Sequence, residues 1–321
     1  FGLFTADCVK FSRDTAIMTA TSDENGCFEF ADVPFGQYIV REIESPSGYI
    51  LSDKEYAVSI AEDGEVIEIT AENKPITVKI SKREIYGNEL KGAKMQIIDS
   101  EGNIVDEWTS DGTDHVVTEL PAGEYTLKEI AAPDGYVIAN DIRFTVDVYG
   151  NVTVENVEAT VTSENGNPLI VMVDDTTKVQ ISKQDITTGE ELPGATLQII
   201  DEDGNVVEEW VSTDEAHFIE GKLIAGKEYT LRETIAPDGY EIANEIKFTV
   251  NDDGTVTEVV MYDEHTPDLE TPPTVTIDTP HTGVSADNGA ELYLVATAVI
   301  MAFGMLICKK NDKKQRKDDV K

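Results

Sequence analysis

The sequence is poor in cysteine. Three cysteines, Cys8, Cys27 and Cys308, occur in 321 residues, too few for the dense disulfide framework of small secreted domains. Cys8 and Cys27 flank predicted strands of one unit, where they either pair or remain two isolated buried thiols. We assign them no chemistry, and we expect something other than disulfides to hold the domains together.

Basic residues are scarce as well. The chain has 25 Lys and Arg against 63 Asp and Glu, which gives a net charge of −38. A field of that sign repels nucleic-acid phosphates and anionic lipid headgroups, so nucleic acids are excluded as partners. Seven of the basic residues lie within residues 309–321, and the rest of the chain is therefore more acidic still.

Before residue 290 the chain shows no sustained helical pattern of apolar residues. Apolar residues instead alternate with a period of two, as at Ile142, Phe144 and Val146, and this pattern indicates half-buried β-strands. Turn signals such as Asp201-Glu-Asp-Gly204 separate the predicted strands. The sequence thus predicts an all-β chain of antiparallel β-sandwich domains.

The chain also repeats itself. Residues 124–146 read EYTLKEIAAPDGYVIANDIRFTV, residues 228–250 read EYTLRETIAPDGYEIANEIKFTV, and a more divergent copy begins at Gln37. The copies are spaced by the length of a small domain, which indicates domains in series rather than a solenoid. We predict three units, at residues 1–75, 76–178 and 179–267.

We predict no metal and no cofactor. The turn at Asp201 resembles part of a calcium loop, but such a loop needs a bidentate Glu at its twelfth position, where Ser212 stands. His115 and His217 occupy matching positions in two repeats and have no Cys or His at ligand spacing. No Cys–His or Ser–His–Asp grouping recurs near a pocket-forming loop, so a hydrolase is not expected and the chain is predicted not to be an enzyme.

The pattern changes after Pro267. Residues 268–283 are rich in Thr and Pro, which predicts an extended polar spacer. Leu292 to Cys308 carry no charge, which predicts one C-terminal transmembrane helix over residues 290–308. The basic tail at residues 309–321 then predicts, by the positive-inside rule, a cytoplasmic C-terminus and three domains outside the cell.

The segment Thr279-Pro280-His281-Thr282-Gly283, followed by the apolar span and the basic tail, resembles the LPXTG sorting signal of Gram-positive surface proteins. The family usually has Leu where Thr279 stands, so the class of sortase stays open. The resemblance implies that sortase cleaves between Thr282 and Gly283 and joins Thr282 to cell-wall peptidoglycan. The mature protein would then lack the hydrophobic segment.

The stretch from Tyr125 through Glu129 to Tyr136 resembles the E-box of SpaA-like, Cna B-type domains, the prealbumin-like sandwiches of pilins and adhesins. All three units carry this stretch. Residues 76–178 are most similar to the streptococcal fibronectin-adhesin domain behind SpyCatcher, and the similarity lies in Val78 to Arg83, the E-box, and Ile170 to Asp174. The resemblance implies an isopeptide bond within the second unit.

By that resemblance, Lys79 on the first strand is joined to Asp174 on the last, with Glu129 assisting. Burial lowers the pKa of a lysine and raises that of a carboxyl group, so a neutral amine can attack while a protonated Glu129 polarises the carbonyl. Strict alternation along Ile76, Val78 and Ile80 instead places Lys82 on their face. The resemblance favours Lys79, since bulges can break alternation at strand edges, and Lys82 is the alternative.

The first unit carries part of the same set. Glu42 stands in its E-box, and Asn73 resembles the acceptor at the end of the last strand. No lysine-bearing strand precedes these residues in the sequence, so we expect an N-terminally truncated domain within a longer repeat protein.

The third unit keeps Glu233 and Asp263 but has Gln180 where Lys79 stands. A glutamine amide is not a nucleophile at neutral pH, so this bond cannot form through position 180. Lys183, equivalent to Lys82, and Lys178 remain as candidates. We expect a unit that is not cross-linked through position 180 and is mechanically softer than its neighbour.

Two functions fit these features. The first is a cell-wall-anchored surface protein whose SpaA-like domains form a stalk or adhesin segment stiffened by isopeptide bonds. The second is a minor or basal pilus subunit incorporated by sortase; a shaft subunit would require a YPKN-like motif, which the sequence lacks. The expected partners are sortase, peptidoglycan and a host matrix protein or other surface ligand.

Overall fold

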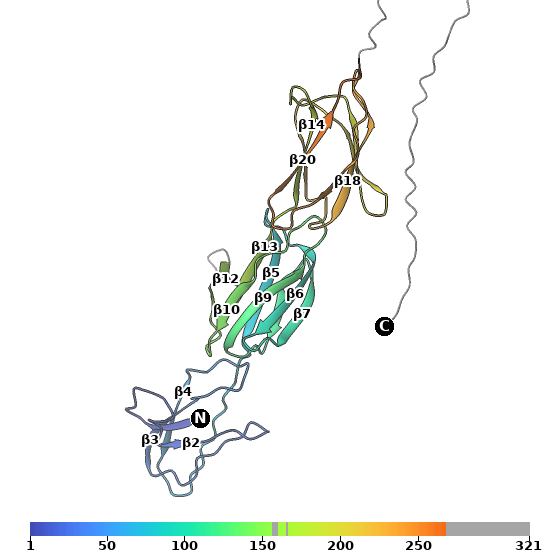
Figure 1. The fold of residues 1–321 in the computed structure, drawn as a ribbon. Helices are drawn as coiled ribbons and strands as arrows, with labels where there is room; N and C mark the ends of the chain where they lie inside the picture. Colours follow the sequence, from blue (N-terminus) through green and yellow to red (C-terminus); the bar gives the residue numbers. More distant parts are fainter. Residues whose placement is uncertain (156–159, 165, 268–321) are drawn as a thin grey trace, which may run out of the picture. The chain divides into compact units, whose positions relative to one another are not determined.

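The computed structural model of the chain describes residues 1–155, 160–164 and 166–267 (Figure 1). Every element in this part is a β-strand, from β1 to β20, which confirms the predicted all-β class. No helix within the described ranges is long and apolar enough to cross a membrane. The predicted span at 290–308 and the motif at 279–283 lie outside the described residues.

The second domain is built from two sheets. One has the order β11-β10-β9-β6-β7, with strands Val152–Val154, Ile142–Val146, Gly123–Ala131, Lys91–Asp99 and Ile104–Asp111. The other has the order β12-β13-β5-β8, with strands Thr160–Glu164, Asn167–Asp174, Thr77–Glu84 and His115–Thr118. The core between them holds Ile80, Met95, Leu127, Phe144 and Ile170, all nearly inaccessible to solvent.

The first and last strands of this domain lie side by side, as Figure 1 shows for β5 and β13. They pair in parallel and without a register shift, from Lys79 opposite Leu169 to Glu84 opposite Asp174. Alternate residues of β5 therefore stay on one face, and Val78, Ile80 and Lys82 are all buried.

The third domain repeats this plan. One sheet has the order β17-β14-β20, with strands His217–Glu220, Lys178–Asp185 and Val256–Asp263. The other has the order β16-β15-β18-β19, with strands Val206–Val211, Thr196–Ile200, Glu228–Ile235 and Ile246–Thr249. The first strand β14 again pairs in parallel with the last strand β20, and Lys183 lies opposite Met261.

The first domain differs from the predicted sandwich. It has a single sheet of order β2-β1-β3-β4, with strands Met18–Thr19, Gly2–Thr5, Gly36–Arg41 and Glu55–Ile60. These strands correspond to the β9 sheet of the second domain. Residues 28–31 and 65–74, which correspond to β8 and β13, form no strand, because the described residues contain no counterpart of β5 to pair with both of them.

Candidate functional site

The second domain buries a lysine between two carboxyl groups. Lys82 lies on β5 with 3% of its surface exposed, and its Nζ donates a hydrogen bond to Glu129 Oε2 at 3.1 Å. The same Nζ contacts Oδ1 of Asp174, the last residue of β13. A buried ammonium is costly unless it is paired, so the three side chains form one unit.

Glu129 is held by the backbone as well as by Lys82. It lies on β9 in alternation with Tyr125 and Leu127, and all three are buried, as the alternation predicted. The amide N–H of Ala139 donates to Glu129 Oε2 at 2.7 Å, while Oε1 accepts no hydrogen bond and is buried. One oxygen is therefore fixed in position, and the other is available for a proton.

The surroundings of Asp174 favour the neutral, protonated form of its carboxyl group. Burial raises the pKa of its carboxyl group to about 7, and the neighbouring Glu129 acts in the same direction, although Lys82 opposes the shift. A protonated carboxyl group is a better electrophile than a carboxylate, which repels an incoming amine. The geometry thus places an amine and two carboxyl groups in contact within a buried core, where they could react with one another.

The structure places Lys79 elsewhere, and this contradicts its assignment as the reacting lysine. Its Nζ pairs with Glu164 at 2.5 Å and with Asp114 at 3.7 Å, on the opposite face of β5 from Lys82. The assignment assumed a bulge that would turn Lys79 inward, but β5 pairs with β13 without one. Lys82, the alternative given by strand alternation, occupies the site.

We expect Lys79→Ala to leave any cross-link of the second domain intact. Its salt bridges lie at the surface, where such pairs contribute about 0–1 kcal/mol, so the variant should fold. Intact-mass measurement should show the same mass deficit as in the parent protein. Lys82→Ala should instead reduce that deficit by the mass of one water. A branched peptide containing Lys79 would contradict the assignment to Lys82.

The third domain contains the same arrangement. Lys183 has 1% of its surface exposed, and its Nζ lies 3.2 Å from Glu233 Oε1 and in contact with Asp263 Oδ1. Burial raises the pKa of Glu233, against a 2.7 Å hydrogen bond from the amide of Ala243.

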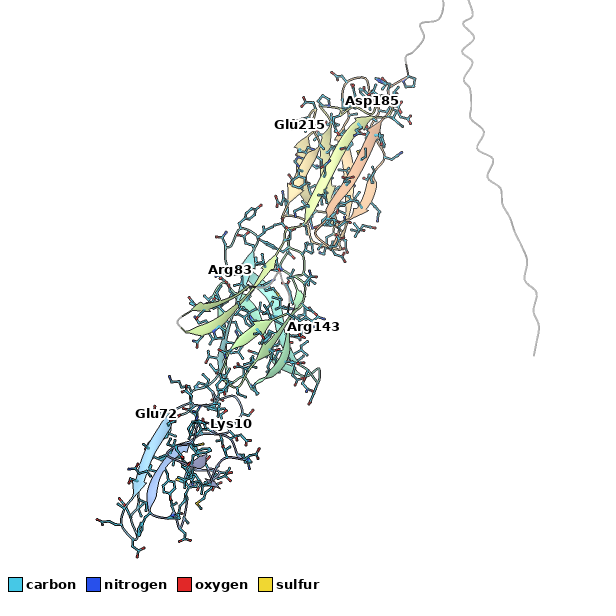
Figure 2. All side chains as sticks on the ribbon, turned by 90° about the vertical axis from the view of Figure 1, so that its left-hand side faces the viewer. Lys10, Glu72, Arg83, Arg143, Asp185 and Glu215 are labelled. Carbon is cyan, nitrogen blue, oxygen red and sulfur yellow. The ribbon has the colours of Figure 1, made fainter. Side chains whose placement is uncertain are left out.

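Gln180 and Lys178 take no part in this arrangement. Gln180 lies on the partly exposed face of β14, and Lys178 pairs with Asp175 at 2.6 Å. The expectation of a softer third unit rested on Lys79 being the nucleophile, and the third domain has the full buried set at Lys183 instead. Asp185, labelled in Figure 2, is the last residue of β14 and lies opposite Asp263, the last residue of β20.

Comparison with known proteins agrees with this repeated architecture. The family model SpaA, described as a prealbumin-like fold domain, matches residues 1–75, 76–167 and 177–265. The chain belongs to this family. No curated protein matches it.

Several solved structures are similar to this SpaA-family chain. The Bacillus anthracis TIE protein is 27% identical with a TM-score of 0.39, over 76% of this chain and 45% of that one. The shaft pilin SpaA from Lactobacillus rhamnosus GG is 15% identical with a TM-score of 0.28, over 60% and 98%. The pilus adhesin SpaC of the same organism, in its open conformation, is 16% identical with a TM-score of 0.35, over 67% and 36%. The chain thus spans less than half of the TIE chain.

The first SpaA domain holds two of the three groups. Glu42 is buried, its Oε2 accepts the amide N–H of Ser52 at 2.9 Å, and its Oε1 accepts the Asn73 side-chain amide at 3.1 Å. Among the described residues no lysine forms an ion pair with Glu42. Glu42 and Asn73, which the sequence analysis singled out as the acid and the acceptor of this domain, are thus in contact.

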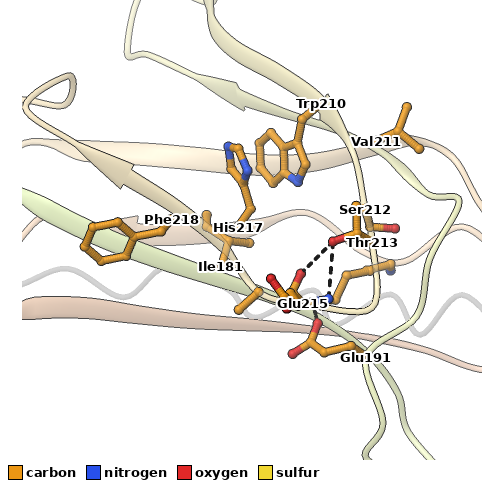
Figure 3. Close-up of a pocket in the computed structure, with 11 residues that line it drawn as sticks. Ile181, Glu191, Trp210, Val211, Ser212, Thr213, Glu215, His217 and Phe218 are labelled. Atoms are coloured by element: carbon orange, nitrogen blue, oxygen red, sulfur yellow. Dashed lines mark hydrogen bonds between the residues drawn. The ribbon is translucent and has the colours of Figure 1, made fainter.

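A cavity of about 120 Å³ lies beside the strand that carries Lys183 (Figure 3). The stacked rings of Trp210 and His217, 4.4 Å apart, line it, and the Lys183 amide donates to Glu191 at 3.1 Å next to it. Ligand pockets usually measure about 300–1,000 Å³. This cavity is therefore smaller than a typical ligand pocket.

Sequence reasoning missed the backbone donors of the site. The amides of Ser52, Ala139 and Ala243 each bind the E-box glutamate from ten residues further along the chain. The equal spacing in the three repeats was visible in the sequence, but a backbone contact leaves no mark on the residue type. No group of residues in the described ranges has the donors to hold a metal ion.

Proposed function

We propose that this protein is a surface protein of a Gram-positive cell whose SpaA domains are stiffened by autocatalytic isopeptide bonds. The observation that carries the proposal is the buried lysine, glutamate and aspartate set, which occurs twice at matching positions, as Lys82, Glu129 and Asp174 and as Lys183, Glu233 and Asp263. Each bond would tie the first strand of its domain to the last.

In the proposed reaction Lys82 acts as a neutral amine. Its Nζ attacks Cγ of protonated Asp174, and Glu129 donates a proton to the carbonyl oxygen as the tetrahedral intermediate forms. Glu129 takes back a proton from the amine nitrogen and passes it to one hydroxyl group of the intermediate, which leaves as water. The remaining oxygen then returns its proton to Glu129 as the amide forms. The amine and the acid become an amide plus water, so the reaction would happen once in each of the two domains that carry the set, and no turnover of a substrate is expected.

The function of such bonds would be mechanical. Three cysteines cannot supply a disulfide framework, and an amide between first and last strands prevents the two from separating under tension. The bond closes a long loop, so it also restricts the unfolded chain as a disulfide does. Both effects suit a stalk or an adhesin segment exposed outside the cell.

The intact mass of the protein tests the cross-links. We expect residues 1–268 to be lighter than their sequence by two waters, with branched peptides joining Lys82 to Asp174 and Lys183 to Asp263 after proteolysis. The double variant Lys82→Ala/Lys183→Ala should have the full sequence mass. A parent protein of full mass would mean that both sets are ordinary buried ion pairs.

The anchoring part of the proposal rests on the sequence after Pro267. Sortase would cleave after Thr282 and transfer the chain to peptidoglycan, so muramidase digestion should release a protein that ends at Thr282. Extraction by detergent, with residues 290–321 retained, would show a membrane protein instead. High-molecular-mass ladders that resist boiling in detergent would favour the alternative, a minor or basal pilus subunit.

A further inference from the structure

The last strand of the third domain lies at the edge of its sheet. β20 pairs with β14 on one side, and among the described residues no strand pairs with it on the other. Its counterpart in the second domain is β13, since Met172 of β13 and Met261 of β20 each lie opposite the buried lysine of their domain. β13 is covered on its other side by β12. The third domain therefore leaves open an edge that the second domain covers.

This open edge lacks the features that usually protect an exposed strand. Natural proteins shorten, bend or charge such edges, or cover them with another segment. β20 is 8 residues long, whereas the other edge strands of the domain, β16, β17 and β19, have 6, 4 and 4. It pairs with β14 without a bulge, contains neither proline nor lysine, and has Glu258 as its only charge before Asp263. We therefore expect another segment to cover it.

The second domain shows what such a cover looks like. β12 has the sequence TVTSE and runs antiparallel to β13, with Val161 opposite Ile170. The side chain of Val161 packs against the hydrophobic core. At the end of the strand, Glu164 accepts a hydrogen bond from Lys79 Nζ at 2.5 Å. The cover is thus a short strand with one valine on the core and one acidic residue bound by the first strand of the domain.

A similar sequence follows the third domain. Residues 274–278, which lie outside the described residues, read TVTID. Val275 stands where β12 has its core-facing valine, and Asp278 stands where β12 ends in glutamate. Thr, Val and Ile are all favoured in strands. Gln180 occupies the position of Lys79 on the first strand, and its side-chain amide can donate to a carboxylate. The segment therefore has the residue types of a covering strand.

The connection to this segment is long enough for it to return to β20. The Thr266 amide donates to the Gly239 carbonyl at 2.9 Å, which holds the chain close to the end of β20. In the register of β12, Thr274 would lie opposite Val260, about 10 Å back along the strand. Residues 267–273 can span up to about 23 Å when extended. The prolines before residue 274 fall in this connection, where they interrupt no strand.

We propose that residues 274–278 add to the open edge of β20 as an antiparallel strand, as β12 does in the second domain. Val275 would lie opposite Val259, which is 7% exposed, and would cover the core. Tethering gives this segment a high effective concentration, whereas a second copy of a chain with net charge −38 is repelled. The proposal goes beyond the proposed function and does not depend on the isopeptide bonds.

Amide hydrogen exchange, resolved by residue, tests the proposal. Alternate residues of β20 direct their N–H groups away from β14. We expect these amides to exchange about 2- to 10-fold more slowly in residues 1–283 than in residues 1–268, a compact unit by itself, because each gains a hydrogen bond. Val275→Asp should restore the faster rates, since it puts a charge against the core. Leu269→Asp makes the same change outside the segment and should keep the protection.

Three results would overturn the proposal. The first is equal exchange of the β20 amides in residues 1–283 and 1–268, which would leave the edge uncovered by this segment. The second is protection that Val275→Asp and Leu269→Asp change equally, because the pairing would then not involve residues 274–278. The third is protection that increases with protein concentration, which would identify a second copy of the chain as the strand on this edge.

Discussion

Replacing Lys82 with methionine will lower the free energy of unfolding of the second domain by several kcal/mol. Lys82 and Asp174 are separated by 92 positions in the sequence, and closing a loop of that length by a covalent bond restricts the unfolded chain by about 4–5 kcal/mol. Methionine keeps the length and apolar character of the lysine stem, so the core should remain filled. Thermal or denaturant unfolding followed by circular dichroism would measure the loss.

The variant should also depend on pH in a defined direction. Burial raises the pKa of Asp174 from 3.8 to about 7 even with Lys82 nearby, and removal of the cation removes an opposing effect. The folded variant therefore holds a proton that the unfolded chain releases, and stability is greatest below about pH 4 and falls as the pH rises through 7. The cross-linked parent lacks this carboxyl group and should lack this dependence.

Lys79→Met provides the control on the same strand. The side chain of Lys79 is 17% exposed and pairs with Glu164 at the surface, so its loss should cost no more than about 1 kcal/mol. Equal destabilisation by Lys79→Met and Lys82→Met would contradict a bond at Lys82. A parent with the same pH dependence as Lys82→Met would contradict it too.

Strand alternation predicted much of the candidate site. It placed Glu129 with Tyr125 and Leu127, and Lys82 with Val78 and Ile80, and each of these residues is buried. Alternation succeeds here because β5 and β9 are regular where these residues lie, and each has one face on the core.

Family resemblance was less reliable for the choice of lysine. The matching block from Val78 to Arg83 contains two lysines, and similarity over so short a stretch does not say which of them faces inward. Taking Lys79 as the reacting lysine also misled the prediction for the third domain, because Gln180 stands at the equivalent position and suggested that this domain lacks the nucleophile. Aligning Lys183 with Lys82 restores the same buried set in both domains.

The contacts between domains could not be predicted from the sequence. A glycine in the turn Pro133-Asp-Gly135-Tyr136 is explained locally by its positive φ. Its second role, allowing the carbonyl of Gly221 to approach, depends on how two domains pack. The left-handed backbone of Glu119 is likewise a result of tertiary structure, since neither its residue type nor its neighbours favour it.

Glu129→Gln will slow the formation of the second-domain bond without preventing folding. Glutamine can still accept the Ala139 amide that holds Glu129 at 2.7 Å, but it cannot donate and retrieve the proton that the reaction needs. General acid–base groups contribute about 10²–10⁴-fold to such rates, so unreacted protein should persist long after the parent has reacted. Time-resolved intact mass after synthesis would follow the conversion.

The third domain provides an internal control for bond formation in the same molecule, because its bond would depend on Glu233 and not on Glu129. Freshly made Glu129→Gln should therefore be lighter than its sequence mass by one water and should lose the second water slowly. The control is Glu124→Gln, an exposed change on the same strand, which should lose both waters at the parental rate. A Glu129→Gln protein that has lost two waters at the earliest time would contradict this role of Glu129. Contact between the amine of Lys82 and the carboxyl group of Asp174 in a buried site would then suffice for the reaction without an acid to assist.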